Sequence, residues 1–207
     1  MKIAVAQGLL QSHSYAKYRS IVSDLLSQGM ATGNESTEAL MHYTELNEVR
    51  MNRLDKKMVI SEENIQKLLA LKKKYIWLVL SEGWCGDAAQ ILPIMNKMAL
   101  VSQHIELKIA FRDENETLMK LFLTKGAKSV PKLLIIEKEV AEVVRNWGPR
   151  PIGATDLFKS YKQQYGAIDE TAKAELQLWY LHDKGLSTQN EIVELMLQAE
   201  QLTLQTK

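Results

Sequence analysis

The feature that most restricts the fold is a near-continuous apolar run from Tyr75 to Leu80, placed directly after three lysines. A run of this length is typical of a strand that is buried on both faces, beneath helices on each side of a sheet. The segments on either side of it, 61–74 and 85–98, carry apolar residues at helical spacing. We therefore expect an α/β fold with this strand near its centre.

The rest of the chain divides into strand and helix periods. The strand period predicts three more strands, over 105–111, 133–136 and 140–146. A short charged turn joins the last two, so we expect them to be antiparallel. The helical period predicts further helices over 15–28, 37–57, 115–125 and 155–165. Two more helices follow Gly166. The first is stopped by Gly185, and the second is expected to begin with a capping box of Thr188 and Glu191.

The composition is that of a globular protein without membrane or nucleic-acid signals. Charged residues make up 25% of the 207, and the formal net charge of +1 is spread along the chain, whereas nucleic-acid binding needs a clustered basic face. No apolar run is long enough to span a membrane, and the N-terminal run breaks too early for a signal peptide. One cysteine cannot form an internal disulfide, so we expect a cytoplasmic location. The four histidines have no metal-ligand spacing, and we expect no metal.

Two short motifs carry the chemistry. Trp84-Cys85-Gly86-Asp87-Ala88 lies between the predicted central strand and a helix, and Ser129-Val130-Pro131 directly precedes the next strand. In this order of elements the two motifs resemble the thioredoxin superfamily, which has Trp-Cys-Gly-Pro-Cys at the first position and a cis-proline facing the cysteine. The chain is similar in particular to a bacterial branch with a Trp-Cys-Gly-Asp motif. That likeness covers roughly residues 40–160 and includes Tyr43, Asn47, Arg50, Met51 and the run 112–115.

This resemblance implies a thioredoxin fold, a central mixed sheet flanked by helices, with helical extensions at both ends. The implied division is an N-terminal extension over 1–60, a thioredoxin-like core over 61–166 and a C-terminal extension over 167–207. Tyr43, Asn47 and Arg50 share one helix face. We interpret that face as packing of the N-terminal extension onto the core, and the alternative is that it covers the active site.

Cys85 is the expected nucleophile. Backbone N–H groups and the positive end of the helix dipole favour thiolate at a helix N-terminus, which predicts a pKa below that of a free thiol. The resemblance implies that Val130 and Pro131 form a platform for the substrate and that Trp84 forms an apolar rim. Gly86 and Asp87 complete the expected substrate-binding set. The opposite interpretation is a buried and inert cysteine.

Three positions qualify this expectation. Ala88 stands where a second cysteine would release product, so a mixed disulfide on Cys85 should persist until an external thiol such as glutathione resolves it. The carboxylate of Asp87 could cap the helix, but its charge would oppose thiolate formation. Arg112 belongs to a charged run that reads first as a solvated loop. It is alternatively a modulator that favours the thiolate or holds a ligand carboxylate.

Two functions remain open on the sequence. The first is a monothiol thiol–disulfide oxidoreductase that acts on disulfide-containing or glutathionylated proteins or on low-molecular-weight thiols, with no cofactor and with glutathione as a co-substrate. The second is a redox-inactive module that binds a protein or peptide. A glutaredoxin-like iron–sulfur or glutathione site is weaker, because Gly148 is followed by Pro149 and not by a glycine-rich segment. We expect a monomer or a homodimer without nucleic-acid or membrane partners.

Overall fold

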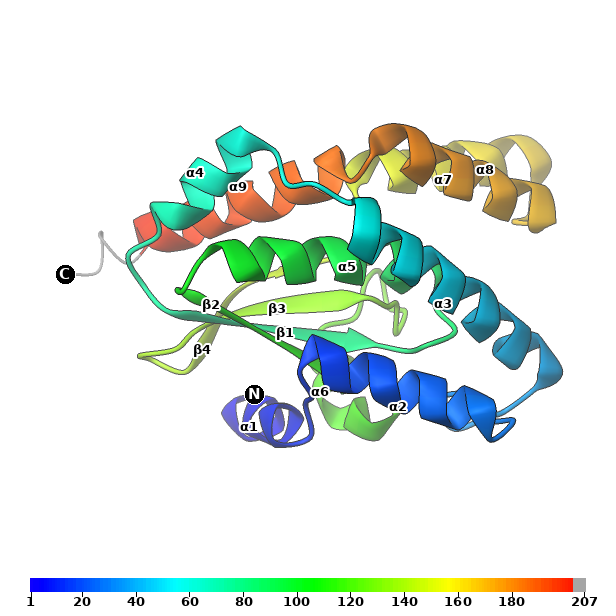
Figure 1. Cartoon of the computed structure of the whole chain (residues 1–207), viewed down its shortest axis with the longest axis horizontal. Helices are drawn as coiled ribbons and strands as arrows, with labels where there is room; N and C mark the ends of the chain where they lie inside the picture. Colours follow the sequence, from blue (N-terminus) through cyan, green and yellow to red (C-terminus); the bar gives the residue numbers. More distant parts are fainter. Residues whose placement is uncertain (203–207) are drawn as a thin grey trace.

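The apolar run forms β1 (Tyr75–Ser81), an inner strand of a four-stranded sheet in the computed structural model, which describes residues 1–202 (Figure 1). The strand order is β2-β1-β3-β4, with β2 (Ile105–Phe111), β3 (Lys132–Glu137) and β4 (Glu142–Trp147). β1 pairs with β2 in parallel and with β3 antiparallel, and β4 is antiparallel to β3. The predicted central strand and the predicted antiparallel pair are therefore confirmed.

Successive side chains of β1 point to opposite faces of the sheet, and each face has its own core. Trp77 and Val79 lie in the larger core, with residues of α5 (Gly86–Val101), α3 (Glu38–Lys57), α4 (Glu62–Leu69), α2 (Tyr15–Ser27) and α9 (Leu186–Leu202). Leu78 and Leu80 lie in the smaller core, with α1 (Lys2–Leu10) and α6 (Glu116–Leu121). A short 3-10 turn, η1 (Asp113–Asn115), leads into α6. The strand is buried on both faces, as its composition predicts.

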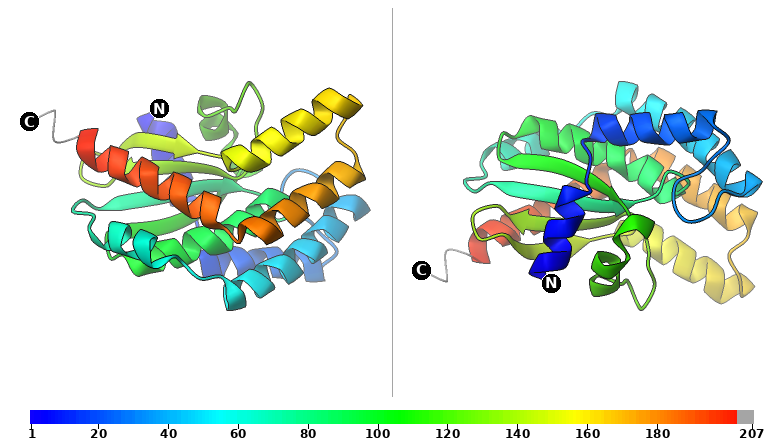
Figure 2. Two further views of the ribbon diagram at one scale, coloured as in Figure 1. Left: turned by 90° about the horizontal axis from the view of Figure 1, so that it is seen from above. Right: turned by 90° about the horizontal axis from the view of Figure 1, so that it is seen from below.

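The C-terminal helices form a long return path. α7 (Ile152–Tyr165) and α8 (Glu170–Asp183) form a hairpin that extends past the C-terminal end of β1, and α9 then runs back across the sheet (Figure 2). α9 packs against α4, α5 and β4, and its Ile192 and Met196 are fully buried. The larger core thus includes a helix that the sequence assigns to the C-terminal extension. The proposed division at residues 60 and 166 stays a prediction.

Helix boundaries differ from the predictions at three places. The helix predicted over 155–165 is α7, which begins three residues earlier, at Ile152. α6 ends at Leu121 and not near Lys125, because Phe122 leaves the helical conformation, with φ −130° and ψ 38°. Lys125 and Gly126 have positive φ in the turn that follows. α9 begins at Leu186, so Thr188 lies inside the helix and the predicted capping box is wrong. The Thr188 hydroxyl is buried and has no hydrogen-bond partner among the residues that the structure describes. In the part of the chain that the structure describes, no helix is long and apolar enough to cross a membrane.

Candidate functional site

Cys85 lies where β1 passes into α5, and it is the N-cap residue of that helix. Its sulfur accepts a hydrogen bond from the Ala88 N–H at 3.4 Å, and the thiol donates to the Val130 carbonyl at 3.2 Å. The Val130–Pro131 peptide bond is cis. Because β1 and β3 are neighbours, the loop after one lies beside the loop before the other. The structure thus brings Cys85, Val130 and Pro131 together.

Trp84 is fixed by the loop between α2 and α3. Its indole N–H donates to the Thr32 carbonyl at 3.1 Å, and the Thr32 hydroxyl accepts from the Gly83 N–H at 2.8 Å. The Arg112 guanidinium carbon lies 5.0 Å from the centre of the Trp84 ring, and its Nε pairs with Asp113 at 2.7 Å. Arg112, the predicted modulator, therefore lies against the tryptophan and not against the sulfur.

Asp87 does not cap α5, so the interpretation of this residue as a helix cap is wrong. Its carboxylate accepts hydrogen bonds from the Arg150 Nε at 2.7 Å and from the Tyr180 hydroxyl at 2.8 Å, and the residue is only 7% exposed. The reason is positional: the Cys85 side chain already occupies the cap and accepts the Ala88 N–H. Asp87 instead joins the first turn of α5 to the start of α7 and to α8.

The chain after β4 delivers Arg150 to this position. Trp147 pairs with Leu133, so the residues that follow β4 run beside Pro131. Gly148 has a φ of +112°, and a Cβ there would lie 2.3 Å from the Pro131 carbonyl oxygen, so only glycine fits. This close approach turns the segment 149–151 toward Asp87.

Helices α3 and α8 cover the start of α5. The side-chain amide of Gln90 donates to Gln177 of α8 at 2.7 Å. A Cβ on Gly86 would lie 3.6 Å from the Gln177 amide nitrogen and 3.9 Å from an Arg50 guanidinium nitrogen. Cys85 is only 8% exposed beneath this cover. Gly86 thus faces two polar side chains, Arg50 of α3 and Gln177 of α8.

The polar face of α3 packs directly on the motif. The Asn47 side chain donates to the Gly83 carbonyl at 2.9 Å, and Arg50 donates to Asn47 at 2.8 Å. Asn47 is buried, and Arg50 is half-buried. Tyr43, by contrast, reaches outward to Glu170 and Lys173 of α8. This face therefore both packs on the core and helps to cover Cys85.

The electrostatics of the thiol contradict the sequence-based expectation. Burial, the larger cause, and the negative charge of Asp87 together raise the pKa of Cys85 to about 12, and the N–H groups of Ala88 and Asp87 only partly oppose this. Burial also raises the pKa of Asp87, against the opposing effects of Arg150 and Tyr180. The predicted pKa below that of a free thiol is therefore wrong for this conformation, in which the thiol is protonated at neutral pH.

Sequence reasoning missed Arg150, Gln177 and Tyr180. Asp87 contacts Arg150 across 63 residues and Tyr180 across 93, and no local pattern predicts such contacts. The Trp-Gly-Pro-Arg-Pro segment before α7 reads as a rigid link, and the helical pattern of α8 shows an ordinary amphipathic helix. The one available signal was Asp87 itself, an acidic residue in an apolar helix that needs a partner when buried.

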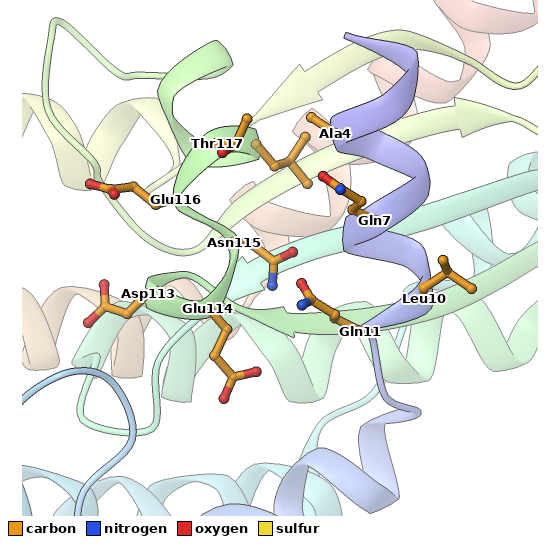
Figure 3. A pocket seen from close by; sticks show the side chains of 10 residues that line it. Ala4, Gln7, Leu10, Gln11, Asp113, Glu114, Asn115, Glu116 and Thr117 are labelled. Carbon is orange, nitrogen blue, oxygen red and sulfur yellow. The ribbon is translucent and has the colours of Figure 1, made fainter.

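A separate pocket of about 360 Å³ lies on the other face of the sheet, between α1 and the η1–α6 segment (Figure 3). The side-chain amides of Gln7, Gln11 and Asn115 converge on it. Asp113, the ion-pair partner of Arg112, also lines this pocket, but Cys85, Val130 and Pro131 do not. Among the described residues, no group of three or more His, Cys, Asp or Glu side chains could hold a metal ion.

Comparison with known proteins identifies the family. A family model described as Thioredoxin matches residues 33–163, and no curated protein matches the chain. A solved structure of a protein of unknown function from Pseudomonas aeruginosa is similar over 90% of this chain and 99% of its own, with 15% identity and a TM-score of 0.56. An HIV epitope-scaffold structure is similar over 89% and 98%, with 17% identity and a TM-score of 0.53.

At these identities the two structures bear on the fold alone, and they agree with a thioredoxin-like sheet that carries additional helices. The family model covers more than half of the chain and includes both motifs, the cysteine at the start of α5 and the cis-proline before β3. The chain therefore belongs to the thioredoxin family.

Proposed function

We propose that the protein carries out monothiol thiol–disulfide exchange at Cys85. The observation that supports this most directly is the placement of the Cys85 sulfur. It lies between the N–H of Ala88 and the carbonyl of Val130, next to Pro131. The N–H groups at the start of α5 oppose the effect of burial on the thiol and stabilise a thiolate once the cover is displaced. We further infer that the chain belongs to the bacterial Trp-Cys-Gly-Asp branch.

The exchange has two balanced steps. The Cys85 thiolate attacks one sulfur of a disulfide R–S–S–R′, the old S–S bond breaks, a Cys85–S–S–R bond forms, and R′–S⁻ leaves. Ala88 has no thiol to resolve this product. An external thiolate, such as that of glutathione in a reducing cytoplasm, therefore attacks the R sulfur of this bond, a glutathione–S–S–R disulfide forms, and Cys85 leaves as the free thiolate. No net electron transfer to a cofactor is needed.

The cover sets the rate of this chemistry. In the covered conformation Cys85 is 8% exposed and its pKa is raised, so the native thiol reacts slowly at neutral pH. Gln177 and Tyr180 of α8 hold the cover through Gln90 and Asp87. Movement of α8 away from α5 would admit a disulfide and hydrate the sulfur in the same step.

The test is adduct formation with oxidised glutathione, followed by intact mass spectrometry at pH 7 and pH 9. We expect one glutathione adduct on the wild type, faster at pH 9 and removed by reduced glutathione, and none on Cys85→Ser. Ala88→Cys places a second thiol one helical turn from the first and should give an internal disulfide with dithiol reductase activity. A native thiol that stays unmodified for hours, while the urea-unfolded chain reacts readily, would overturn the proposal.

The burial of Cys85 favours a second candidate, a redox-inactive module that binds a protein or peptide. A sulfur that donates to Val130 within the core behaves as a small apolar group. Under this function Cys85→Ser would leave partner binding unchanged. The same glutathione experiment separates the two candidates, because the module predicts no adduct on the native chain at either pH.

A further inference from the structure

A groove next to the Cys85 cover, with which it shares Gln90 and Tyr180, runs between the end of α3, the middle of α5 and the elbow that joins α8 to α9. The elbow is visible beside the end of α3 in both views (Figures 1 and 2). Apolar side chains line the groove, including Leu54, Met58, Ile94, Leu181 and Leu186. We call this feature the elbow groove. Its volume is about 510 Å³.

The backbone of the elbow shapes the groove. Lys184 and Gly185 both have positive φ, 53° and 77°, which turns the chain sharply between the two helices. A Cβ on Gly185 would lie 2.7 Å from the Ile94 side chain and 3.0 Å from Met58, so glycine lets the elbow pack against the groove floor. The walls of the groove are therefore fixed by helix packing and not by a loose loop.

Apolar surface is left open to solvent here. Leu181 and Leu186 are each 47% exposed, and Val59, which also lines the groove, is 75% exposed. Single exposed apolar side chains are common on protein surfaces, but here three large ones surround one concave surface. Such a patch is typical of a ligand or interaction site. A bound apolar chain would remove this surface from water.

The charges around the elbow groove all have one sign. Arg53, Lys57 and Lys184 line it, and no acidic residue does. Within residues 1–202, none of these three cations forms an ion pair. Arg50, one turn earlier on α3, has its pKa lowered by burial and by the charge of Arg53. The carboxylate of Asp183, beside Lys184 in sequence, accepts a hydrogen bond from the backbone N–H of Ser187. No ion pair among the described residues therefore neutralises these three cations directly.

The size of the elbow groove favours a small molecule over a protein. Small-molecule sites span about 300–1,000 Å³ and combine an apolar lining with a few placed polar groups. A stable protein interface buries on the order of 1,200–2,000 Å², far more than a groove with twelve lining residues offers. The occupant must also be anionic, to complement three cations. These two conditions together describe an amphiphile.

We propose that the elbow groove binds a small anionic amphiphile, a carboxylate on a saturated hydrocarbon chain. The carboxylate lies among Arg53, Lys57 and Lys184, and the hydrocarbon chain lies along Met58, Ile94 and Leu181. This proposal is independent of the proposed function of Cys85, because no step in it uses the thiol.

The test is isothermal titration of the full chain with dodecanoate below its micelle concentration. We expect saturable binding with one site, at least tenfold tighter than binding of hexanoate. Dodecyltrimethylammonium, which has the same chain with the opposite charge, should bind at least tenfold more weakly. Raising the salt concentration should weaken dodecanoate binding, because the head-group contacts are partly exposed. Equal binding of the cationic and anionic amphiphiles would overturn the proposal.

Matched variants locate the site. Arg53→Gln combined with Lys57→Gln should weaken dodecanoate binding about tenfold, and Leu181→Gln should weaken it by a similar factor. Lys56→Gln removes an exposed lysine of the same helix that does not line the groove, and it should bind like the wild type. All of these side chains are solvent-accessible, so the variants should keep the wild-type circular dichroism. Unchanged binding in the Arg53/Lys57 variant and in Leu181→Gln would place the ligand elsewhere and overturn the proposal.

Discussion

At the residue scale, two effects of opposite sign compete for the pKa of the Cys85 thiol. The start of a helix favours a negative charge by about 0.3–1 kcal/mol, and by up to about 2 kcal/mol in partly buried sites. One pKa unit corresponds to about 1.4 kcal/mol, so this effect is worth roughly one unit. Full burial shifts a pKa by up to about 3–5 units. Burial therefore wins at Cys85, although it is the N-cap residue of α5.

The raised pKa of Cys85 makes a prediction about stability. A thiol whose pKa is about 12 in the folded chain, and about 8.5 when unfolded, stabilises the fold below the unfolded value, and this contribution is lost as pH rises toward 12. We expect the free energy of unfolding of the wild type to fall relative to that of Cys85→Ser between about pH 8.5 and pH 10.5, by at most about 1.4 kcal/mol per pH unit. Urea titrations of both proteins measure the difference. Parallel curves would mean that the native thiol titrates normally.

Asp87 allows a second prediction at the same scale. Asp87→Asn removes the negative charge beside the sulfur and keeps an acceptor for Arg150 and Tyr180. Alkylation of Cys85 by iodoacetamide at pH 8 should become roughly 3- to 10-fold faster, which corresponds to a pKa lower by about 0.5–1 unit. Tyr180→Phe is the matched control, since it keeps the charge and most of the cover. An equal acceleration in both variants would point to loosened packing as the cause.

At the element scale, some helix starts with a side-chain cap were predictable from the sequence and others were not. The N-caps Thr37 and Ser61 each accept a backbone N–H, and both helices begin where the sequence indicates. Thr188 carries the same type of signal, but α9 begins before it, because the elbow at Lys184 and Gly185 turns the chain directly into the helix. Tertiary packing thus overrode a local capping pattern.

The buried Thr188 hydroxyl gives a prediction for α9. It is fully buried and has no hydrogen-bond partner within residues 1–202, and an unsatisfied buried polar group costs about 1–3 kcal/mol. Thr188→Val keeps the shape and removes the hydroxyl, so it should raise the free energy of unfolding by about 1 kcal/mol, as measured by urea denaturation. Thr188→Ser keeps the hydroxyl, loses the methyl group and should be less stable than the wild type. A valine variant less stable than the wild type would contradict this account.

At the scale of the whole molecule, the sequence predicts what is local. The apolar strand, the cysteine after it and the proline before β3 are each readable from a few residues, and they fix the fold and half of the site. The other half comes from side chains that arrive through tertiary packing, such as Tyr180 on Asp87 and Gln177 on Gln90. The burial of the Cys85 sulfur and the charges around it depend on these tertiary contacts. The direction of the pKa shift of Cys85 was therefore not predictable from the sequence.

The position of α9 tests whether the core ends near residue 166. Ile192, Val193 and Met196 are buried in the same core as Trp77, and each such side chain is worth about 1.5–3 kcal/mol. Their sum approaches the whole stability of a typical domain, about 5–15 kcal/mol. A chain that ends at residue 185 should therefore lack a cooperative urea transition, which a chain ending at residue 202 should keep. Cooperative unfolding of the shorter chain would support the division at residue 166.

The contact between Trp77 and Met196 has a consequence for synthesis of the protein. The indole N–H of Trp77 donates to the Met196 sulfur across 119 residues. At about 5–20 residues per second, the ribosome needs roughly 6–24 s to make the intervening chain. For that time one face of the central strand has no helix α9 to cover it. The nascent chain therefore exposes this face of an apolar strand for that time, until α9 has been made and can cover it.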